Sequence, residues 1–243
     1  MIERPRLVLL AGNMCDARLW AEVAPALAGW PIATPLLDRD SIAAMAAAVL
    51  VAHPGRLIPI GFSMGGIVAL EMARQASGRI TALGLIDTNA SADLPERAAV
   101  RPRQQADVRA GALERVVVEE LKPHYLAPAR RDDRALLALL RDMALALGPD
   151  IFVRQSEALR TRADLRAVLP DLDRPVLIAC GAEDRLCPPA WHRELADGAP
   201  RATLHIVPGA GHMLPLEQPA ALAAALSGWL HIVEQEETCP IAS

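Results

Sequence analysis

The chain has 243 residues, 52% of them hydrophobic, so it can bury the core of one large α/β domain. Its formal net charge is −4 and its Lys and Arg residues are scattered, which disfavours nucleic acid and membrane surfaces as partners. The apolar run near the N-terminus is too short for a signal peptide, and no run approaches the length of a membrane span, so we expect a cytoplasmic protein.

The first third of the chain alternates short β-type apolar runs with segments of helical spacing. The strand-like runs are Arg6–Gly12, Trp30–Leu37, Arg56–Phe62 and Ile80–Asp87. The helical segments are Arg18–Leu27, Ser41–His53 and Met64–Ala76. Strands that alternate with helices predict a doubly wound, mostly parallel sheet with helices on both faces.

Residues 90–170 break this rhythm, because they contain no strand-like run and are rich in Arg, Asp, Glu, Ala and Leu. The predicted helices there are Pro95–Ala110, Ala112–Leu121, Arg131–Leu147 and Asp150–Thr161. Pairs that contain proline separate these helices. We therefore expect a helical insertion into the sheet domain, since no flexible hinge marks it as a second domain.

The alternation of strands and helices resumes after the insertion. The predicted strands are Pro175–Gly181 and Ala202–Gly209, and the predicted helices are Pro188–Ala196 and Glu217–Val233. The polar tail, residues 234–243, is expected to be frayed and disordered. The sequence thus predicts a core of residues 1–89 and 171–233, with a helical cap of residues 90–170 inserted into it.

The cysteines and histidines indicate neither a disulfide framework nor a metal site. The four cysteines, Cys15, Cys180, Cys187 and Cys239, are few and irregularly spaced. They form no C-x-x-C pair, and the histidines show no metal-ligand spacing with carboxylates or cysteines. We expect free thiols and no bound metal.

A serine between two glycines ends the third predicted strand. Ser63 lies between Gly61 and Gly65, which gives Gly-x-Ser-x-Gly in the strand–turn–helix context that a nucleophile elbow needs. The alternative is an ordinary helix N-cap, a position at which serine is also favoured. Capping requires neither the flanking glycines nor partners elsewhere in the chain, so we interpret Ser63 as a nucleophile.

A serine nucleophile needs a general base, and an acid that orients the base. His212 lies in a Gly-rich loop after the last predicted strand, and Asp184 follows the strand before it. Both positions are at the carboxyl ends of strands, where parallel sheets build their sites. Rivals for the acid are Glu183, its neighbour, and Asp87, at the end of the fourth strand. We favour Asp184, because it lies past the turn expected after the strand.

An oxyanion hole needs backbone amides aimed at the charge that develops on the carbonyl oxygen. One is expected from Met64, directly after the serine, and the other from the loop after the first strand, at Asn13 or at its neighbour Met14. We favour Asn13. Further candidates for the wall of the substrate pocket are Met14, Cys15, His124 and Tyr125.

The stretches LLAGNMCDARLW, GFSMGG, GAEDRLCPP and GAGHMLPLEQP follow one another along the chain and resemble the α/β-hydrolase superfamily. The order Ser63, Asp184, His212 is also the order of that superfamily. The resemblance covers nearly the whole chain and implies an α/β-hydrolase fold, with a helical cap between the fourth and fifth strands.

Two departures from the superfamily pattern bear on the expected fold and site. Ala11-Gly12 stands where the family often has His-Gly, which leaves the glycine and the amide of the oxyanion loop intact. The first strand begins near Arg6, so the family's usual N-terminal antiparallel hairpin is missing. The resemblance then implies a sheet of about six strands in the order 2-1-3-4-5-6.

The resemblance and the proposed site imply a serine hydrolase of the carboxylesterase type. It would cleave esters or thioesters of small to medium acyl groups through an acyl-enzyme intermediate, without a cofactor. Alternatives that use the same triad are a C–C bond hydrolase, a lactonase or a cofactor-free perhydrolase, and a further alternative is a hydrolase-fold ligand receptor. We expect a small-molecule substrate and a monomer or homodimer.

Overall fold

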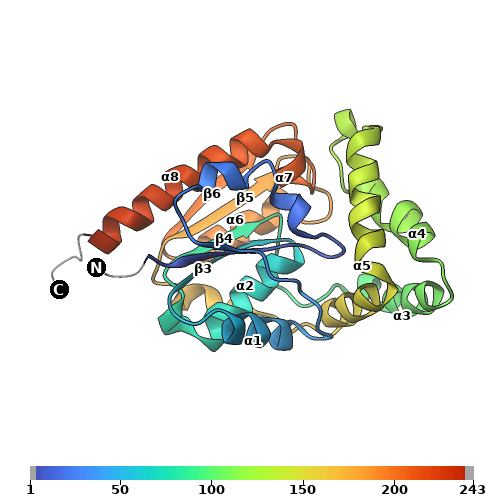
Figure 1. The fold of residues 1–243 in the computed structure, drawn as a ribbon, viewed down its shortest axis with the longest axis horizontal. Helices are drawn as coiled ribbons and strands as arrows, with labels where there is room; N and C mark the ends of the chain where they lie inside the picture. The colour runs from blue at the N-terminus through green and yellow to red at the C-terminus, as the bar shows by residue number, and fades with distance from the viewer. Residues whose placement is uncertain (1–3, 239–243) are drawn as a thin grey trace.

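The computed structural model describes residues 4–238 and contains a six-stranded sheet with helices on both faces (Figure 1). The strands are β1 (Arg6–Leu10), β2 (Ile32–Ala33), β3 (Leu57–Phe62), β4 (Leu83–Ile86), β5 (Val176–Gly181) and β6 (Ala202–Val207). Their order is β2-β1-β3-β4-β5-β6, and each neighbouring pair is parallel. The predicted fold class and strand order are confirmed, and the sheet formed by the described residues has no antiparallel strand.

The central strands are apolar at every position but Arg6 of β1, because both faces of the sheet are buried. In β1, Val8 and Leu10 pack into the hydrophobic cluster on one face, and Leu7 and Leu9 pack into the cluster on the other face. Successive side chains of a strand point to opposite faces, so a continuous apolar run fills both layers at once. This is why the strands read as unbroken apolar runs in the sequence.

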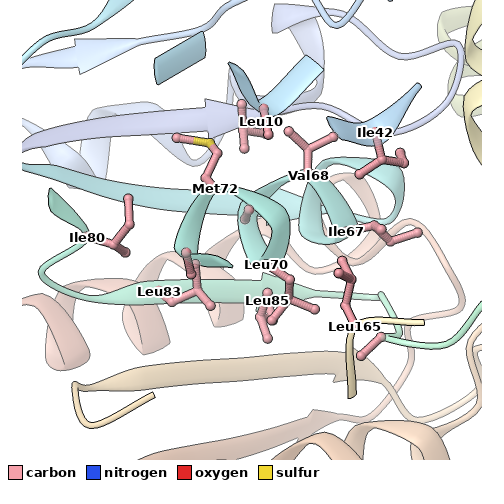
Figure 2. Packing of buried hydrophobic residues seen from close by; sticks show 14 of the residues in the cluster. Leu10, Ile42, Ile67, Val68, Leu70, Met72, Ile80, Leu83, Leu85 and Leu165 are labelled. Carbon is pink, nitrogen blue, oxygen red and sulfur yellow. The ribbon is translucent and has the colours of Figure 1, made fainter. Parts of the chain in front are cut away.

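The face drawn below the sheet in Figure 1 is covered by α1 (Ile42–Ala52) and α2 (Met64–Gln75). Helix α6 (Pro189–Gly198) packs into the same cluster through Leu195. Figure 2 shows α2 at the centre of this layer, where Val68 faces Leu10 and Leu70 lies beside Leu85. The burial of α2 anchors the turn that precedes it.

The opposite face is covered by α7 (Leu214–Glu217), α8 (Pro219–Thr238) and two 3-10 helices, Ala17–Trp20 and Ala24–Leu27. No helix in the part of the chain that the structure describes is long and apolar enough to cross a membrane. A third 3-10 helix, Ser77–Arg79, connects α2 to β4.

Between β4 and β5 the chain forms a group of helices at one end of the sheet (Figure 1). The group consists of α3 (Pro95–Arg109), α4 (Leu113–Arg115), a π-helix (Val116–Leu121), 3-10 helices at Lys122–His124 and Pro128–Arg130, and α5 (Arg134–Arg160). A further 3-10 helix, Arg166–Asp171, returns the chain to the sheet, where Leu169 packs in the same cluster as α2 and α6. Within α5, Gly148 has φ of 81° and ψ of 176° just before Pro149, which produces a kink. The bounds 90–170 for the cap stay a prediction.

Two predicted elements near the N-terminus are shorter than expected, and prolines explain both. The single helix expected at Arg18–Leu27 is instead two 3-10 helices, because Pro25 has no amide for a helical hydrogen bond and its ring clashes with the preceding turn. The strand expected at Trp30–Leu37 shrinks to β2 at the sheet edge, since Pro31 and Pro35 flank it and cannot donate to a ladder.

The expected tail at residues 234–243 is partly wrong. Helix α8 continues to Thr238, so residues 234–238 are helical, whereas residues 239–243 lie outside the described part of the chain. Glu and Gln are good helix formers, and no breaker precedes Pro240. Glu234 pairs with Arg4 and Glu236 with Arg201, and these ion pairs connect the last turns of the helix to the core.

Candidate active site

Ser63 occupies a strained turn between β3 and α2. Its backbone has φ of 51° and ψ of −117°, a conformation that a residue with a side chain rarely adopts. Its side chain makes no capping hydrogen bond to α2, so the N-cap interpretation fails on geometry. The amide of Ser63 donates to Ile86 O at 2.8 Å, which fixes the turn against β4.

The glycines on both sides of Ser63 are required by close backbone contacts. A Cβ at Gly61 would lie 2.2 Å from Gly65 O, and a Cβ at Gly65 would lie 2.1 Å from Leu10 O. No real Cβ tolerates such a distance from a backbone oxygen, so both positions need glycine. The pattern Gly-x-Ser-x-Gly thus follows from the crowding of strand, turn and helix.

The structure brings Ser63, His212 and Asp184 into one hydrogen-bonded chain. His212 Nε2 lies 3.0 Å from Ser63 Oγ, and His212 Nδ1 lies 2.8 Å from Asp184 Oδ2. An imidazole with its proton on Nδ1 donates to Asp184 and accepts from the serine hydroxyl. The His212 and Asp184 side chains are 3% and 0% exposed, so water does not compete for these contacts.

Asp184 is oriented by the backbone as well as by His212. Its Oδ1 accepts hydrogen bonds from the amides of Leu186 at 2.8 Å and Cys187 at 2.9 Å. Both lone-pair regions of the carboxylate are therefore used, one oxygen for the loop and the other for the imidazole. The carboxylate is held in the geometry that fixes the histidine tautomer.

The two rival acids do not reach His212. Glu183 is exposed on the surface. Asp87 is buried, and its carboxylate accepts from the amides of Gly181 at 3.0 Å and Leu214 at 3.1 Å. Burial, and next the nearby Asp184 charge, raise the pKa of Asp87 well above its usual range. Its contacts are those of a structural group that joins β5 to the histidine loop.

The loop after β1 separates Asn13 from Met14, the two candidates for the second oxyanion amide. The amide of Met14 donates to Gln155 Oε1 at 2.8 Å, and Asn13 Nδ2 donates to the same oxygen at 3.2 Å. The Met14 amide is thus already bound, and the Met14 side chain packs into the core of the cap. Asn13 lines the cavity together with Met64, whose amide is at the N-terminus of α2. Asn13 is therefore the better candidate for the second amide.

A cavity of about 260 Å³ contains Ser63 and His212 in its wall. Of the pocket candidates, Cys15, His124 and Tyr125 line it, whereas Met14 does not. The Tyr125 ring lies 5.7 Å from the His212 ring, and the amide of His212 donates to Tyr125 O at 2.7 Å. The helical insertion thus forms part of the cavity wall and contacts the histidine directly.

Four buried polar residues that sequence reasoning missed hold this site in place. They are Thr88, Gln155, His192 and Glu217. Glu217 accepts from the amides of Ala127 at 2.7 Å, Gly211 at 2.8 Å and Met213 at 3.2 Å, so it connects the insertion to the histidine loop. The Glu217 carboxylate follows the histidine by five positions, but nothing in the sequence says that it is buried.

His192 supports the turn that carries Ser63 through hydrogen bonds that pass by way of Thr88. Its Nδ1 donates to Pro188 O at 3.3 Å, and its Nε2 accepts from the Thr88 amide at 2.9 Å. Thr88 Oγ1 in turn donates to Ser63 O at 2.7 Å. Burial lowers the pKa of His192 to about 4, so its imidazole is neutral at pH 7 and can accept the Thr88 bond.

The cysteines in the described part of the chain are poor nucleophiles and poor ligands. Cys15, Cys180 and Cys187 are free and buried, while Cys239 lies outside the described residues. Burial raises the pKa of Cys15 and of Cys180 to about 12. Cys187 Sγ lies within 4.8 Å of potential ligand atoms of Asp184 and His212, but those atoms already have hydrogen-bond partners. The donor set favours proton transfer over metal ligation.

Comparisons with known proteins agree with this fold. Residues 7–225 match the sequence model of the alpha/beta hydrolase family. The pimeloyl-[acyl-carrier protein] methyl ester esterase of Aromatoleum aromaticum is 30% identical, over 93% of this chain and 98% of that protein. The structure of a thermophilic esterase from Thermogutta terrifontis superposes with a TM-score of 0.87 and 27% identity, covering 94% of this chain and 90% of that chain.

One relative is much longer than this chain. The biotin biosynthesis bifunctional protein BioHC of Cellvibrio japonicus is 28% identical over 92% of this chain, but the match covers 47% of that protein. This chain therefore spans about half the length of that bifunctional relative.

Proposed function

Because the chain belongs to the alpha/beta hydrolase family, we propose that it is a serine esterase that cleaves carboxylic esters, or thioesters, of small to medium acyl groups. The observation that carries this proposal is the hydrogen-bonded chain from Ser63 Oγ through His212 to Asp184, at the wall of a cavity. The names of two relatives, a methyl ester esterase and a thermophilic esterase, favour ester chemistry over the alternatives.

In the proposed reaction, Ser63 Oγ attacks the ester carbonyl while His212 Nε2 takes the hydroxyl proton. The imidazolium that forms is stabilised by Asp184, which remains a carboxylate. The negative charge on the carbonyl oxygen is met by the amides of Met64 and Asn13, and the N-terminus of α2 adds its positive dipole. Preorganised donors of this kind cost no rearrangement as the charge develops.

His212 then returns its proton to the leaving alcohol, and the acyl group stays on Ser63 as an ester. Water enters, loses a proton to His212 and attacks the acyl carbonyl. His212 then gives this proton to Ser63 Oγ as the bond to the acyl carbon breaks, which releases the acid and restores the serine hydroxyl. Each step uses only the three side chains, the two amides and water. Glu217 and the Tyr125 carbonyl hold the loop that carries His212 in register during these transfers.

The proposal is tested with p-nitrophenyl butyrate and a matched pair of proteins. The wild-type protein should hydrolyse this ester, and Ser63→Ala should lower kcat by about three to six orders of magnitude with an unchanged circular dichroism spectrum. Full activity in the folded variant would show that another group is the nucleophile. A panel that adds lactones, β-diketones and hydrogen peroxide separates the alternative chemistries.

A further inference from the structure

One face of helix α3 forms a wall of the cavity that contains Ser63. Arg97, Val100, Arg101 and Gln104 all line the cavity, and they recur at the spacing that puts helical side chains on the same side. Two guanidinium groups on this helix therefore face the same enclosed space as the serine. A third, Arg162, enters the cavity wall from the segment after α5.

Arg101 and Arg162 share a single carboxylate. Arg101 Nε lies 2.7 Å from Asp93 Oδ2, and Arg162 Nη1 lies 2.7 Å from Asp93 Oδ1. The Asp93 side chain is 2% exposed, so its charge is fully committed to these two contacts. Two positive charges against one negative charge leave one positive charge in excess at this wall.

Arg162 and Arg101 differ in how many of their guanidinium N–H groups remain without a hydrogen-bond partner in the described residues. Arg162 is buried and also donates to the carbonyls of Ser91 at 3.0 Å and Leu159 at 3.2 Å, so it is held as a structural group. Arg101 bonds to Asp93 through Nε, and its two Nη groups have no hydrogen-bond partner among the residues that the structure describes. Those two groups are the ones that a ligand can use.

Arg97 adds a second uncompensated charge. Its Nη2 donates to Leu186 O at 3.0 Å, and its guanidinium lies 5.7 Å from the Trp191 ring centroid. Both partners are neutral. The other acid of the cavity wall, Glu120, is bound by Arg103 and Arg115 from outside the cavity, so it does not offset Arg97. The cavity is thus positive in a chain whose net charge is −4.

Apolar side chains complete the same cavity, among them Phe62, Ile67, Leu159 and Met213. Guanidinium groups beside apolar walls bind carboxylate and phosphate oxygens strongly, through paired charge-assisted hydrogen bonds. We propose that the ester substrate carries an anionic oxygen group, a carboxylate or a phosphate, that Arg97 and Arg101 bind while the apolar walls hold the chain between it and the ester. This inference rests on the proposed esterase function and names its substrate class.

The test compares pairs of esters in which one member carries an anionic group at the end away from the scissile bond and the other is neutral there. Monomethyl adipate carries a carboxylate, and its neutral counterpart is the methyl ester of adipic acid monoamide. A second pair compares methyl 6-phosphonooxyhexanoate with methyl 6-hydroxyhexanoate. The quantity measured is the ratio of kcat/KM for the anionic ester to that for its neutral counterpart, with products quantified by chromatography.

The wild-type ratio should exceed about ten for at least one pair, because a hydrogen bond to a charged group contributes on the order of tenfold to a hundredfold. The pair that shows this preference identifies carboxylate or phosphate as the group. The ratio should fall about tenfold or more in Arg97→Gln and in Arg101→Gln. Arg109→Gln, an exposed arginine of the same helix outside the cavity, should keep the wild-type ratio.

Arg97→Gln keeps the test valid if Arg101→Gln fails to fold, because Arg97 takes no part in the ion pairs of Asp93. The inference is overturned if wild-type protein cleaves both members of each pair equally well, or if the preference survives both variants. If the wild-type protein cleaves none of the four esters or p-nitrophenyl butyrate, the proposed esterase function fails instead, and this inference falls with it.

Discussion

At the scale of residues, the contacts of His212 separate Asp184, the acid that the sequence favours, from its rival Asp87. Asp184 contacts His212 Nδ1 at 2.8 Å, whereas the Asp87 carboxylate contacts only the amides of Gly181 and Leu214 among the residues described. The sequence places both acids at the ends of strands. It cannot say which of them points at the imidazole, since that depends on how each loop turns after its strand.

We expect Asp184→Asn to lower kcat for p-nitrophenyl butyrate by about three to four orders of magnitude, because asparagine favours the wrong histidine tautomer. Asp87→Asn keeps the shape of its side chain and removes a carboxyl that burial already disfavours as an anion. Its amide oxygen can still accept one of the two backbone hydrogen bonds, although its NH2 group cannot accept the other. Its kcat should fall by less than about tenfold. A larger loss in Asp87→Asn than in Asp184→Asn would reverse the assignment.

His192 gives stability a pH dependence of defined sign. An unfolded histidine has a pKa of about 6.5, and burial lowers the pKa of His192 to about 4. The unfolded chain therefore binds the proton more readily. The contribution of neutral His192 is fully present above about pH 6.5 and is lost as the pH falls toward 4.

Urea unfolding at pH 7 and pH 5 measures this contribution. Between these values, the free energy of unfolding of the wild-type protein should fall by about 2 kcal/mol more than that of His192→Gln. The glutamine amide can still accept a hydrogen bond from Thr88 but has no proton to gain. Equal falls in both proteins would show that His192 does not contribute to acid sensitivity.

At the scale of elements, the elbow depends on contacts between backbones. Strand β3, helix α2 and strand β1 approach one another so closely that Gly65 leaves no room for a methyl group next to Leu10 O. The sequence signals this crowding well, because the glycines and serine lie close together in the chain. Local geometry of this kind can be predicted from a short motif.

Replacement of Gly65 by alanine should lower the free energy of unfolding by about 3 kcal/mol or more, because the new Cβ meets a backbone atom that cannot move alone. Gly78, in the 3-10 helix Ser77–Arg79, is the matched control. A Cβ there meets nothing within 4 Å, and Gly78→Ala should change stability by less than about 1 kcal/mol. Thermal unfolding of the two variants side by side is the measurement, and similar stabilities would refute the steric argument.

The length of an element is hard to predict where apolar residues have helical spacing but a proline opposes a continuous helix. The segment around Pro25 has helical spacing, but the proline restricts it to 3-10 turns. In contrast, the pair Gly148–Pro149 predicts a break between two helices, and α5 is kinked there. Apolar periodicity reveals where an element lies, and the chemistry of single breakers decides its length.

At the scale of the whole molecule, the parallel sheet could be predicted from the alternation of strands and helices, and the strand order from the resemblance to the α/β-hydrolase superfamily. The contacts that connect the insertion to the sheet domain could not. Gln155 lies 141 residues from Met14, and Glu217 lies 90 residues from Ala127. The packing of the insertion decides which side of α5 faces the loop after β1. A short stretch of sequence does not predict this packing.

These long-range contacts give the insertion two roles. It supplies the cavity wall with Arg97 and Arg101, and it fixes the loops that carry Asn13 and His212. The hydrogen bonds that link Ser63, His212 and Asp184 lie where the insertion meets the sheet domain, so the same contacts set the shape of the cavity and the geometry of the proposed triad.

Reaction of the native protein with a fluorophosphonate, followed by intact mass and peptide mapping, tests the central claim most directly. The reagent phosphonylates a serine only where a base and oxyanion donors activate it. We predict one adduct per chain, on Ser63, absent from Ser63→Ala and slowed by at least about a thousandfold in His212→Ala. Native protein that stays unmodified, or an adduct on any residue other than Ser63, would contradict the account.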